Sequence, residues 1–199
     1  MFLAAHKREQ ILPQPVVLIS TKDENEICNI APWSNITSIL RPLDEIVLAS
    51  WIKRDTLENI RETQEFVVNI PSTNMIEEVM TCSKNYPPQV DEFECSKLKV
   101  HASKEIKAPG IEGCLAWAEC KLVEEIKREK YSLIIGKVVS LEVNDNFFNE
   151  DGDMDYEKAK PLSIMLGNKG MWFTHPVFTG KYNKYSEMFI EQKDKDPNL

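Results

Sequence analysis

The chain has 199 residues, of which 42% are hydrophobic and 28% charged, and its formal net charge is −8 at pH 7. This composition is typical of one soluble globular domain with a substantial core. The negative charge argues against a nucleic-acid-binding protein, and the absence of a long apolar run argues against a membrane span.

Five cysteines are scattered along the chain, an odd number with no CxxC pair. A chain of this size folds without disulfide bonds, so we expect reduced thiols in a cytoplasmic protein. The first five residues are too short for a signal sequence and are followed directly by His6-Lys-Arg, so no export signal is expected.

The first half of the chain alternates short apolar segments with turns and two helical segments. The polar turn 22–26 predicts a hairpin between the first two strands. The second helix is expected to be capped by Asn74 and to have Ile76, Val79 and Met80 on its apolar face. The expected strands are 16–21, 27–30, 35–40, 45–51 and 65–70, and the expected helices are 55–62 and 74–81.

The second half is dominated by two long strands, 114–126 and 131–143, which form another predicted hairpin, after a short strand near 98–102. In the first long strand, alternation places Cys114, Ala116, Ala118, Cys120 and Leu122 on one face and Glu119, Lys121, Glu125 and Lys127 on the other. Many antiparallel strands with few short helices predict a closed or nearly closed barrel, formed by residues 1–199 as a single domain. The charged tail after about residue 181 is expected to be an arm on a partner subunit or partly disordered.

The segment 45–61 reads as a buried strand, then a basic turn, then a helix. Asp55 and Glu58 have the spacing of a capping box, so the helix is expected to start at Asp55 or Thr56. Lys53 and Arg54 lie just before a helix end that already carries partial positive charge, an arrangement that suits a bound anion such as phosphate. A capped helix beside two solvated cations is an equally open interpretation of this segment alone.

Common catalytic and cofactor motifs are absent. The chain has no GxGxxG, no GxxxxGK[ST] and no GxSxG, so it predicts neither a Rossmann site, a P-loop nor a hydrolase nucleophile. His6, His101 and His175 have no metal-ligand spacing. No catalytic residue and no metal site are therefore predicted.

Three other segments carry a recognisable pattern. They are Asn29-Ile-Ala-Pro-Trp-Ser-Asn, the stretch from Ser50 to Ile60 with Phe66-Val-Val-Asn behind it, and Tyr86-Pro-Pro-Gln-Val-Asp-Glu-Phe. In this order and spacing the chain resembles the flavin reductase-like, FMN-binding split-barrel family of the flavoredoxin type, over about residues 12–143. The resemblance implies a mainly β fold, a Greek-key antiparallel split β-barrel with a few short helices, which forms a homodimer with FMN near the subunit interface.

The resemblance also implies which residues bind FMN. Lys53, Arg54 and Thr56 would hold the phosphate, a Pro-fixed turn at 31–34 would present backbone groups to the ring edge, and Trp33 or Trp51 would stack on it. Asn35 and Asn69 would bond the ring or ribityl chain, or are ordinary turn and strand-end asparagines. The expected FMN-binding residues are Asn29, Ala31, Pro32, Trp33, Ser34, Asn35, Ala49, Ser50, Trp51, Lys53, Arg54, Asp55, Thr56, Cys82 and Tyr86.

Two of these residues keep an alternative. Cys82 lies where a family member could place a thiol near the flavin, but a buried inert thiol is the better interpretation, and Tyr86 serves equally well as a packing aromatic. The sequence departs from the family after Pro161, where Gly167 and Trp172 are weak candidates. The expected function is electron transfer from NAD(P)H through FMN to an acceptor. The alternatives are a flavoredoxin-type carrier reduced by a protein partner, and a non-catalytic barrel.

Overall fold

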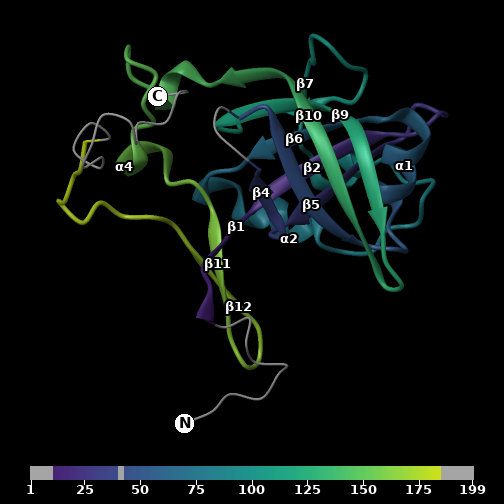
Figure 1. Cartoon of the computed structure of the whole chain (residues 1–199), viewed down its shortest axis with the longest axis horizontal. Coiled ribbons are helices and arrows are strands. Elements are labelled where there is room, and N and C mark those ends of the chain that lie inside the picture. Colours follow the sequence, from purple (N-terminus) through teal and green to yellow (C-terminus); the bar gives the residue numbers. More distant parts are fainter. Residues whose placement is uncertain (1–10, 40–42, 185–199) are drawn as a thin grey trace, which may run out of the picture.

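A seven-stranded antiparallel sheet forms the body of the protein in the computed structural model, which describes residues 11–39 and 43–184 (Figure 1). The strands in spatial order are β3 (Cys28–Trp33), β2 (Val17–Lys22), β6 (Glu65–Ile70), β9 (Ala116–Lys127), β10 (Tyr131–Val143), β5 (Glu45–Trp51) and β4 (Ile36–Ser38). Every pairing in this sheet is antiparallel, and the hairpins β2–β3 and β9–β10 are formed as predicted.

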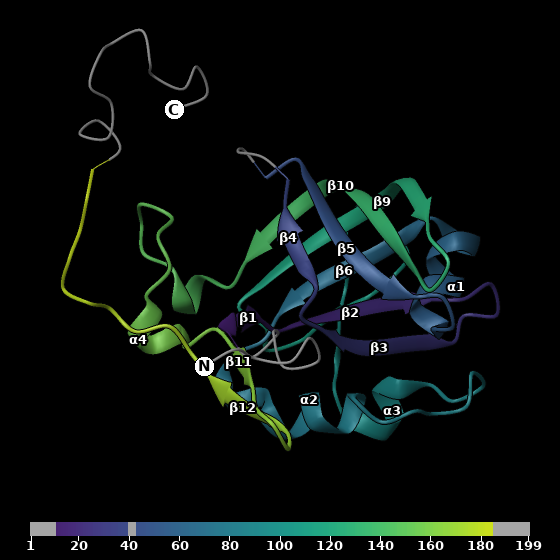
Figure 2. The ribbon, with the colours of Figure 1, turned by 60° about the horizontal axis from the view of Figure 1, so that its bottom comes forward.

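The two edge strands of this sheet are consecutive in the chain. β3 ends at Trp33 and β4 begins at Ile36, so only Ser34 and Asn35 connect one edge with the other. The Ala49 amide of β5 donates to the Asn35 carbonyl at 2.9 Å, which fixes this connection against the sheet. So short a link requires the sheet to curl until its edges meet, as Figure 2 shows. The predicted split barrel is therefore confirmed.

Each face of the sheet covers a separate hydrophobic core. The inner core contains Ile19, Leu48, Phe66 and Ile134, and the helix α1 (Asp55–Thr63) adds Leu57 and Ile60 to it. Full burial of a side chain such as Phe66 stabilises the fold by roughly 1.5–3 kcal/mol. The strand β10 has Gly136 opposite this ring because a Cβ there would overlap Phe66.

The outer core lies under the helices α2 (Ile76–Cys82) and α3 (Glu92–Ser96), which pack along β3 (Figure 2). Because both faces of β2 and β6 are covered, their residues are buried almost without alternation. Asn69 is fully buried in this layer, where its amide donates to the Leu18 carbonyl at 2.8 Å and its Oδ1 accepts from the Ile111 amide at 2.8 Å. Of the two roles considered for Asn69, contact with the cofactor or a strand-end asparagine, the structure agrees with the second.

Three expectations about local structure are corrected. Ser72, not Asn74, caps the second helical segment, which begins as a 3-10 turn over Thr73–Met75. Met80, expected on the apolar face of α2, is 48% exposed. Glu119, expected on the polar face of its strand, is buried, and its carboxylate accepts the amides of Lys104 and Glu105 from a loop that covers it.

Smaller elements extend from the barrel. The strands β1 (Gln14–Pro15), β11 (Ser163–Leu166) and β12 (Met171–Thr174) form a three-stranded sheet, drawn below the barrel in Figure 1. The short pair β7 (Val100–His101) and β8 (Gly110–Ile111), the 3-10 turn Asp145–Phe147 and the helix α4 (Tyr156–Ala159) complete the described elements. The end of the expected strand 35–40 and most of the tail 181–199 lie outside the described residues. No helix in the described part of the chain is long and apolar enough to span a membrane.

Candidate functional site

A cleft of about 450 Å³ opens where the two edges of the barrel meet. Its volume lies within the range of small-molecule and cofactor sites. β3 and the connection after it line one side, the end of β5 and the start of α1 line another, and the segment after α2 closes the third. The predicted site residues that line it are Asn29, Ala31, Pro32, Trp33, Ser34, Asn35, Ala49, Trp51, Lys53, Arg54, Asp55, Thr56, Cys82 and Tyr86.

Ser50 is the predicted residue that the cleft does not include. It is 1% exposed, and its hydroxyl donates to the Trp51 carbonyl at 2.8 Å. Side chains alternate along β5, so Ala49 and Trp51 face the cleft while Ser50 points into the barrel. The alternation of side chains along a strand therefore predicts, from the sequence alone, that Ser50 points away from Ala49 and Trp51.

The amino end of α1 carries no side-chain cap. Arg54 holds the N-cap position in an extended conformation, and its carbonyl accepts the amides of Leu57 and Glu58 at 3.0 and 3.1 Å. The expected capping box is therefore wrong, and Asp55 is the first helical residue instead of the cap. The amides of Asp55 and Thr56 have no partner within the helix, so this end can accept an anion.

Basic side chains surround the uncapped helix end. Lys53 and Arg54 are exposed beside it, and Lys84 enters the cleft from the segment after α2. Arg54 Nη1 donates to Asn85 Oδ1 at 3.3 Å, which connects the start of α1 to the opposite side of the cleft. Within the described residues, none of these three cations forms an ion pair with a carboxylate. Their charge is available to an anionic ligand.

A hydrogen-bond chain runs from this helix end into the protein. The Thr56 hydroxyl donates to Asn29 Oδ1 at 2.7 Å, and Asn29 Nδ2 donates to Glu92 Oε1 at 3.0 Å. The Ile30 amide donates to Glu92 Oε2 at 2.9 Å. Glu92 is 5% exposed, and burial raises the pKa of its carboxyl to about 7, well above its usual range. Asn29 and Thr56 are therefore held in fixed positions, with Glu92 as their buried anchor.

Two tryptophans offer aromatic surface at the cleft. Trp51 is 63% exposed at the end of β5, whereas Trp33 is half-buried and its indole nitrogen is buried without a hydrogen-bond partner among the described residues. Pro32 lies in β3 and not in the expected turn, which is allowed because β3 is an edge strand.

Cys82 lies in the wall of the cleft and is 3% exposed. Burial raises the pKa of its thiol to about 12, so it remains protonated at neutral pH and is not a nucleophile. Tyr86 is half-buried on the same side of the cleft. The inert interpretation of Cys82 agrees with this environment.

Five residues of the cleft were not predicted: Ser83, Lys84, Asn85, Glu92 and Met171. The first four belong to or adjoin segments that the resemblance had marked, and Glu92 follows the helix cap Asp91, so the sequence held a signal for them. Met171 comes from β12, far along the chain, and had no such signal. Trp172, the weak candidate beside it, is 74% exposed and does not line the cleft.

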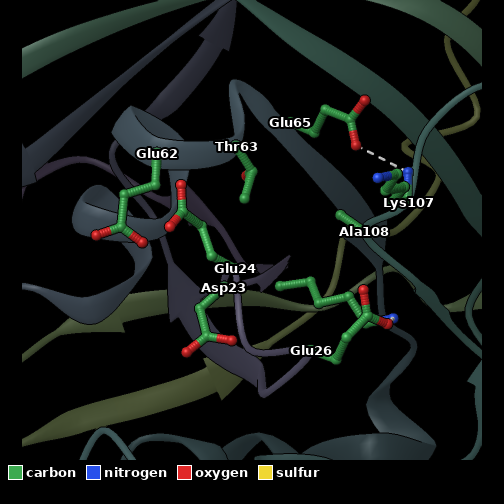
Figure 3. A pocket seen from close by; sticks show the side chains of 9 residues that line it. Asp23, Glu24, Glu26, Glu62, Thr63, Glu65, Lys107 and Ala108 are labelled. Carbon is green, nitrogen blue, oxygen red and sulfur yellow. Dashed lines mark hydrogen bonds and ion pairs between the residues drawn. The ribbon is translucent and has the colours of Figure 1, made fainter.

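A second cavity, of about 330 Å³, has the opposite charge (Figure 3). Asp23, Glu24, Glu26, Glu62 and Glu65 line it together with two lysines, and the Lys107 amide donates to Glu65 Oε2 at 2.8 Å. This surface repels anions, whereas the cleft at Lys53 and Arg54 attracts them.

Comparison with known proteins identifies relatives along most of the chain. Residues 8–162 match the family model described as flavin reductase like domain. A protein of Methanothermobacter thermautotrophicus, described as uncharacterized, is 46% identical over 199 residues, covering 98% of this chain and 94% of its own.

Two solved structures have a similar fold. Nitrilotriacetate monooxygenase component B from Bacillus cereus has a TM-score of 0.78 at 25% identity, covering 88% of this chain and 94% of its own. The flavoredoxin of Desulfovibrio vulgaris (Miyazaki F) has a TM-score of 0.78 at 19% identity, covering 91% of this chain and 100% of its own.

Proposed function

The chain belongs to the flavin reductase-like domain family and is a flavin-related oxidoreductase; from this premise we propose that it binds FMN without a covalent bond and passes electrons from NAD(P)H to an acceptor. The observation that carries the proposal is the uncapped amino end of α1, flanked by Lys53 and Arg54, inside a cleft of cofactor size. We further propose that residues 1–199 form one such domain.

The residues of the cleft fit the parts of FMN. The free amides of Asp55 and Thr56 and the two neighbouring cations suit the phosphate, and Arg54 also bridges to Asn85 across the opening. Trp51 offers a flat aromatic surface for the isoalloxazine ring, and the edge strand at Pro32 offers backbone groups to it. The negative cavity around Glu62 has five carboxylates against two lysines and no aromatic side chain, so it suits neither the phosphate nor the ring.

The protein contributes binding and orientation in this proposal. When bound, FMN supplies the hydride and electron transfer itself, so the mechanism needs no general acid or nucleophile from the chain. Lys53, Arg54 and the α1 amides would hold the phosphate end, while Thr56 and Asn29 are already fixed by hydrogen bonds before any ligand arrives. Such prior order lowers the entropic cost of binding.

A flavoredoxin-type electron carrier is the second candidate. It is favoured by the similar folds of two flavoredoxins, the one from Desulfovibrio vulgaris and another from Methanosarcina acetivorans, which has a TM-score of 0.77 at 20% identity. In that case a redox protein, instead of NAD(P)H, would deliver the electrons.

We also propose a homodimer. Trp51, Met171 and Trp172 are 63%, 54% and 74% exposed, and the first two lie at the cleft, so a second copy would bury apolar surface beside the cofactor. Light scattering on the purified protein should give twice the chain mass of 22.9 kDa. A particle of one chain mass would reject the dimer without affecting the flavin assignment.

The cofactor proposal is tested by spectroscopy. The purified protein, or the protein after addition of FMN, should show a bound-flavin visible spectrum and quench FMN fluorescence on titration. Rapid anaerobic bleaching by NADH or NADPH supports the reductase, and bleaching by dithionite alone supports the carrier. A colourless protein that does not respond to FMN at micromolar concentrations would rule out both.

A further inference from the structure

The Glu92 carboxylate occupies a decisive place in the hydrogen-bond chain at the cleft. Both of its oxygens accept, one from Asn29 Nδ2 at 3.0 Å and the other from the Ile30 amide at 2.9 Å. The Asn29 side chain therefore presents its NH₂ to Glu92 and its Oδ1 to Thr56. As a result the Thr56 hydroxyl proton is used within the protein, and the hydroxyl cannot also donate it to a phosphate.

Protonation of Glu92 would reverse this chain. A neutral carboxyl has one O–H donor, which suits Asn29 only if the amide turns and presents its oxygen to Glu92. The Asn29 NH₂ group would then point at Thr56 and donate to its hydroxyl oxygen. The Thr56 hydroxyl proton would be released for an anion at the amino end of α1. The two amide orientations have almost the same shape, so the turn needs no change in packing.

The surroundings of Glu92 bring the titration of its carboxyl into the neutral pH range. Burial raises the pKa of the Glu92 carboxyl, and the charges of Asp55 and Asp91 raise it further. Hydrogen bonds from the Ile30 amide and the Asn29 side chain lower it, and the resulting pKa is about 7. The other ionisable groups near it are the Cys82 thiol of α2 and the Tyr86 phenol of the following loop. Cys28, on the adjacent strand β3, has a thiol whose pKa burial raises to about 11.

Glu92 borders a second cavity beside the cleft. This smaller cavity has a volume of about 190 Å³, and its acidic residues include Asp23, Asp55, Glu58 and Glu62. The cations Lys53, Arg54 and Lys84 belong to the main cleft and not to this cavity. Glu92 thus separates a basic cleft from an acidic cavity and can take up a proton from solvent on the acidic side.

We propose that Glu92 is a positioning residue that couples anion binding at the amino end of α1 to the uptake of one proton, acting through Asn29 and Thr56. The inference rests on the proposed FMN phosphate site and adds to it a reason for pH dependence. Loss of the Glu92 charge also removes repulsion from the anion, so both effects have the same sign. Anion affinity rises as the pH falls through neutrality.

The test compares the wild type with two substitutions in α3. Glu92→Gln imitates the neutral acid, because its NH₂ donates to Asn29 while its oxygen accepts from Ile30. Glu94→Gln is the matched control, an exposed glutamate with the same charge change in the same helix. FMN affinity is measured by fluorescence quenching at pH 6.5 and 8.5, with riboflavin, which has no phosphate, as the reference ligand.

We expect wild type and Glu94→Gln to bind FMN about tenfold more tightly at pH 6.5 than at pH 8.5, the effect of one hydrogen bond to a charged group. Glu92→Gln should bind at pH 8.5 as tightly as wild type does at pH 6.5 and lose the pH dependence. Thr56→Val should also remove most of the pH dependence of FMN affinity. Riboflavin affinity should not depend on pH in any of these proteins.

Sulfate separates this inference from the proposed function, because sulfate stays a dianion throughout this pH range. The amide shift of Thr56 in NMR reports its binding. If FMN fails to bind but sulfate affinity still rises at low pH in wild type and not in Glu92→Gln, the coupling stands and the cofactor assignment fails. If FMN binds and its affinity for the wild type is the same at both pH values, the coupling is overturned and the cofactor assignment stands. The same conclusion follows if FMN binds and Glu92→Gln weakens its binding at both pH values. If neither ligand binds, both are overturned.

Discussion

Simultaneous removal of the Lys53 ammonium and the Thr56 hydroxyl is the most direct test of the phosphate site. Lys53→Ala removes an exposed cation. Thr56→Ala removes the hydroxyl of a residue that is 2% exposed, and this hydroxyl is hydrogen-bonded to Asn29. Neither side chain belongs to the two hydrophobic cores. The double variant should therefore fold while binding the phosphate less tightly.

The size of the loss follows from the two positions. An exposed cation beside a phosphate contributes about 1 kcal/mol in a solvent-rich setting, and a hydroxyl that donates to a charged oxygen about 1.5 kcal/mol. Together these give about 2.5 kcal/mol, or roughly a 70-fold weaker FMN affinity. Arg54 and the helix amides remain, so binding should be reduced and not abolished. The Lys53 share should shrink as salt increases.

The assay is fluorescence quenching of FMN and of riboflavin at pH 6.5 and low ionic strength. FMN affinity should fall by the stated factor while riboflavin affinity changes little. Lys99→Ala, which removes an exposed lysine outside the cleft, is the control. If FMN and riboflavin weaken together, the two residues do not act on the phosphate, and if neither weakens, the reasoning is refuted.

Three other outcomes follow from the structure. Gly136→Ala should lower the free energy of unfolding by about 1–3 kcal/mol in urea, because its Cβ would overlap the Phe66 ring. Arg61, which donates to Glu125 at 2.5 Å, holds the pKa of that carboxyl at about 2. Wild type should therefore exceed Glu125→Gln in stability by about 1 kcal/mol above pH 4.5 and lose this advantage as the pH falls through about 2, measured by urea unfolding. All five cysteines lie in the described residues, and only Cys95 is exposed. Cys95 should therefore react with a thiol reagent at pH 8 well before the other four.

Each of these outcomes has a matched comparison. Gly170→Ala places a Cβ in open space and should leave stability nearly unchanged. Glu124→Gln makes the same charge change as Glu125→Gln on an exposed neighbour, and an equal pH response of the two would contradict the role of the Arg61 pair. Modification of Cys82 as fast as that of Cys95 would contradict its burial, which raises its pKa to about 12.

The sequence predicted the strands well where hydrophobic pattern and chain breakers coincide. The strands 45–51, 65–70 and 131–143 have the observed bounds of β5, β6 and β10, because each apolar run ends at a charged turn or a proline. Helix caps were predicted less well. Asp55 and Asn74 both had suitable side chains and spacing, yet the backbone placed Arg54 and Ser72 at the cap positions. Spacing alone cannot specify which residue leaves the helical conformation.

Burial of polar residues also depended on distant parts of the chain. Glu119 has the pattern of a solvated strand residue, but the loop at Lys104 and Glu105 folds over it and supplies two amides. Asn69 resembles a strand-end asparagine, but outer-layer contacts to Leu18 and Ile111 enclose it. Neither contact is local, so strand periodicity gives no signal for them.

The sequence by itself determined the family resemblance, the strand-rich fold and the identity of nearly all cleft residues, because these depend on local patterns and their order. Tertiary structure alone decided that Met171 reaches the cleft from β12 and that Glu92 lies buried behind Asn29. These outcomes depend on how the sheet curls until β3 and β4 meet and on where α3 packs against β3. The charge state of Glu92 follows from that packing, since burial of a carboxyl is a property of the folded chain.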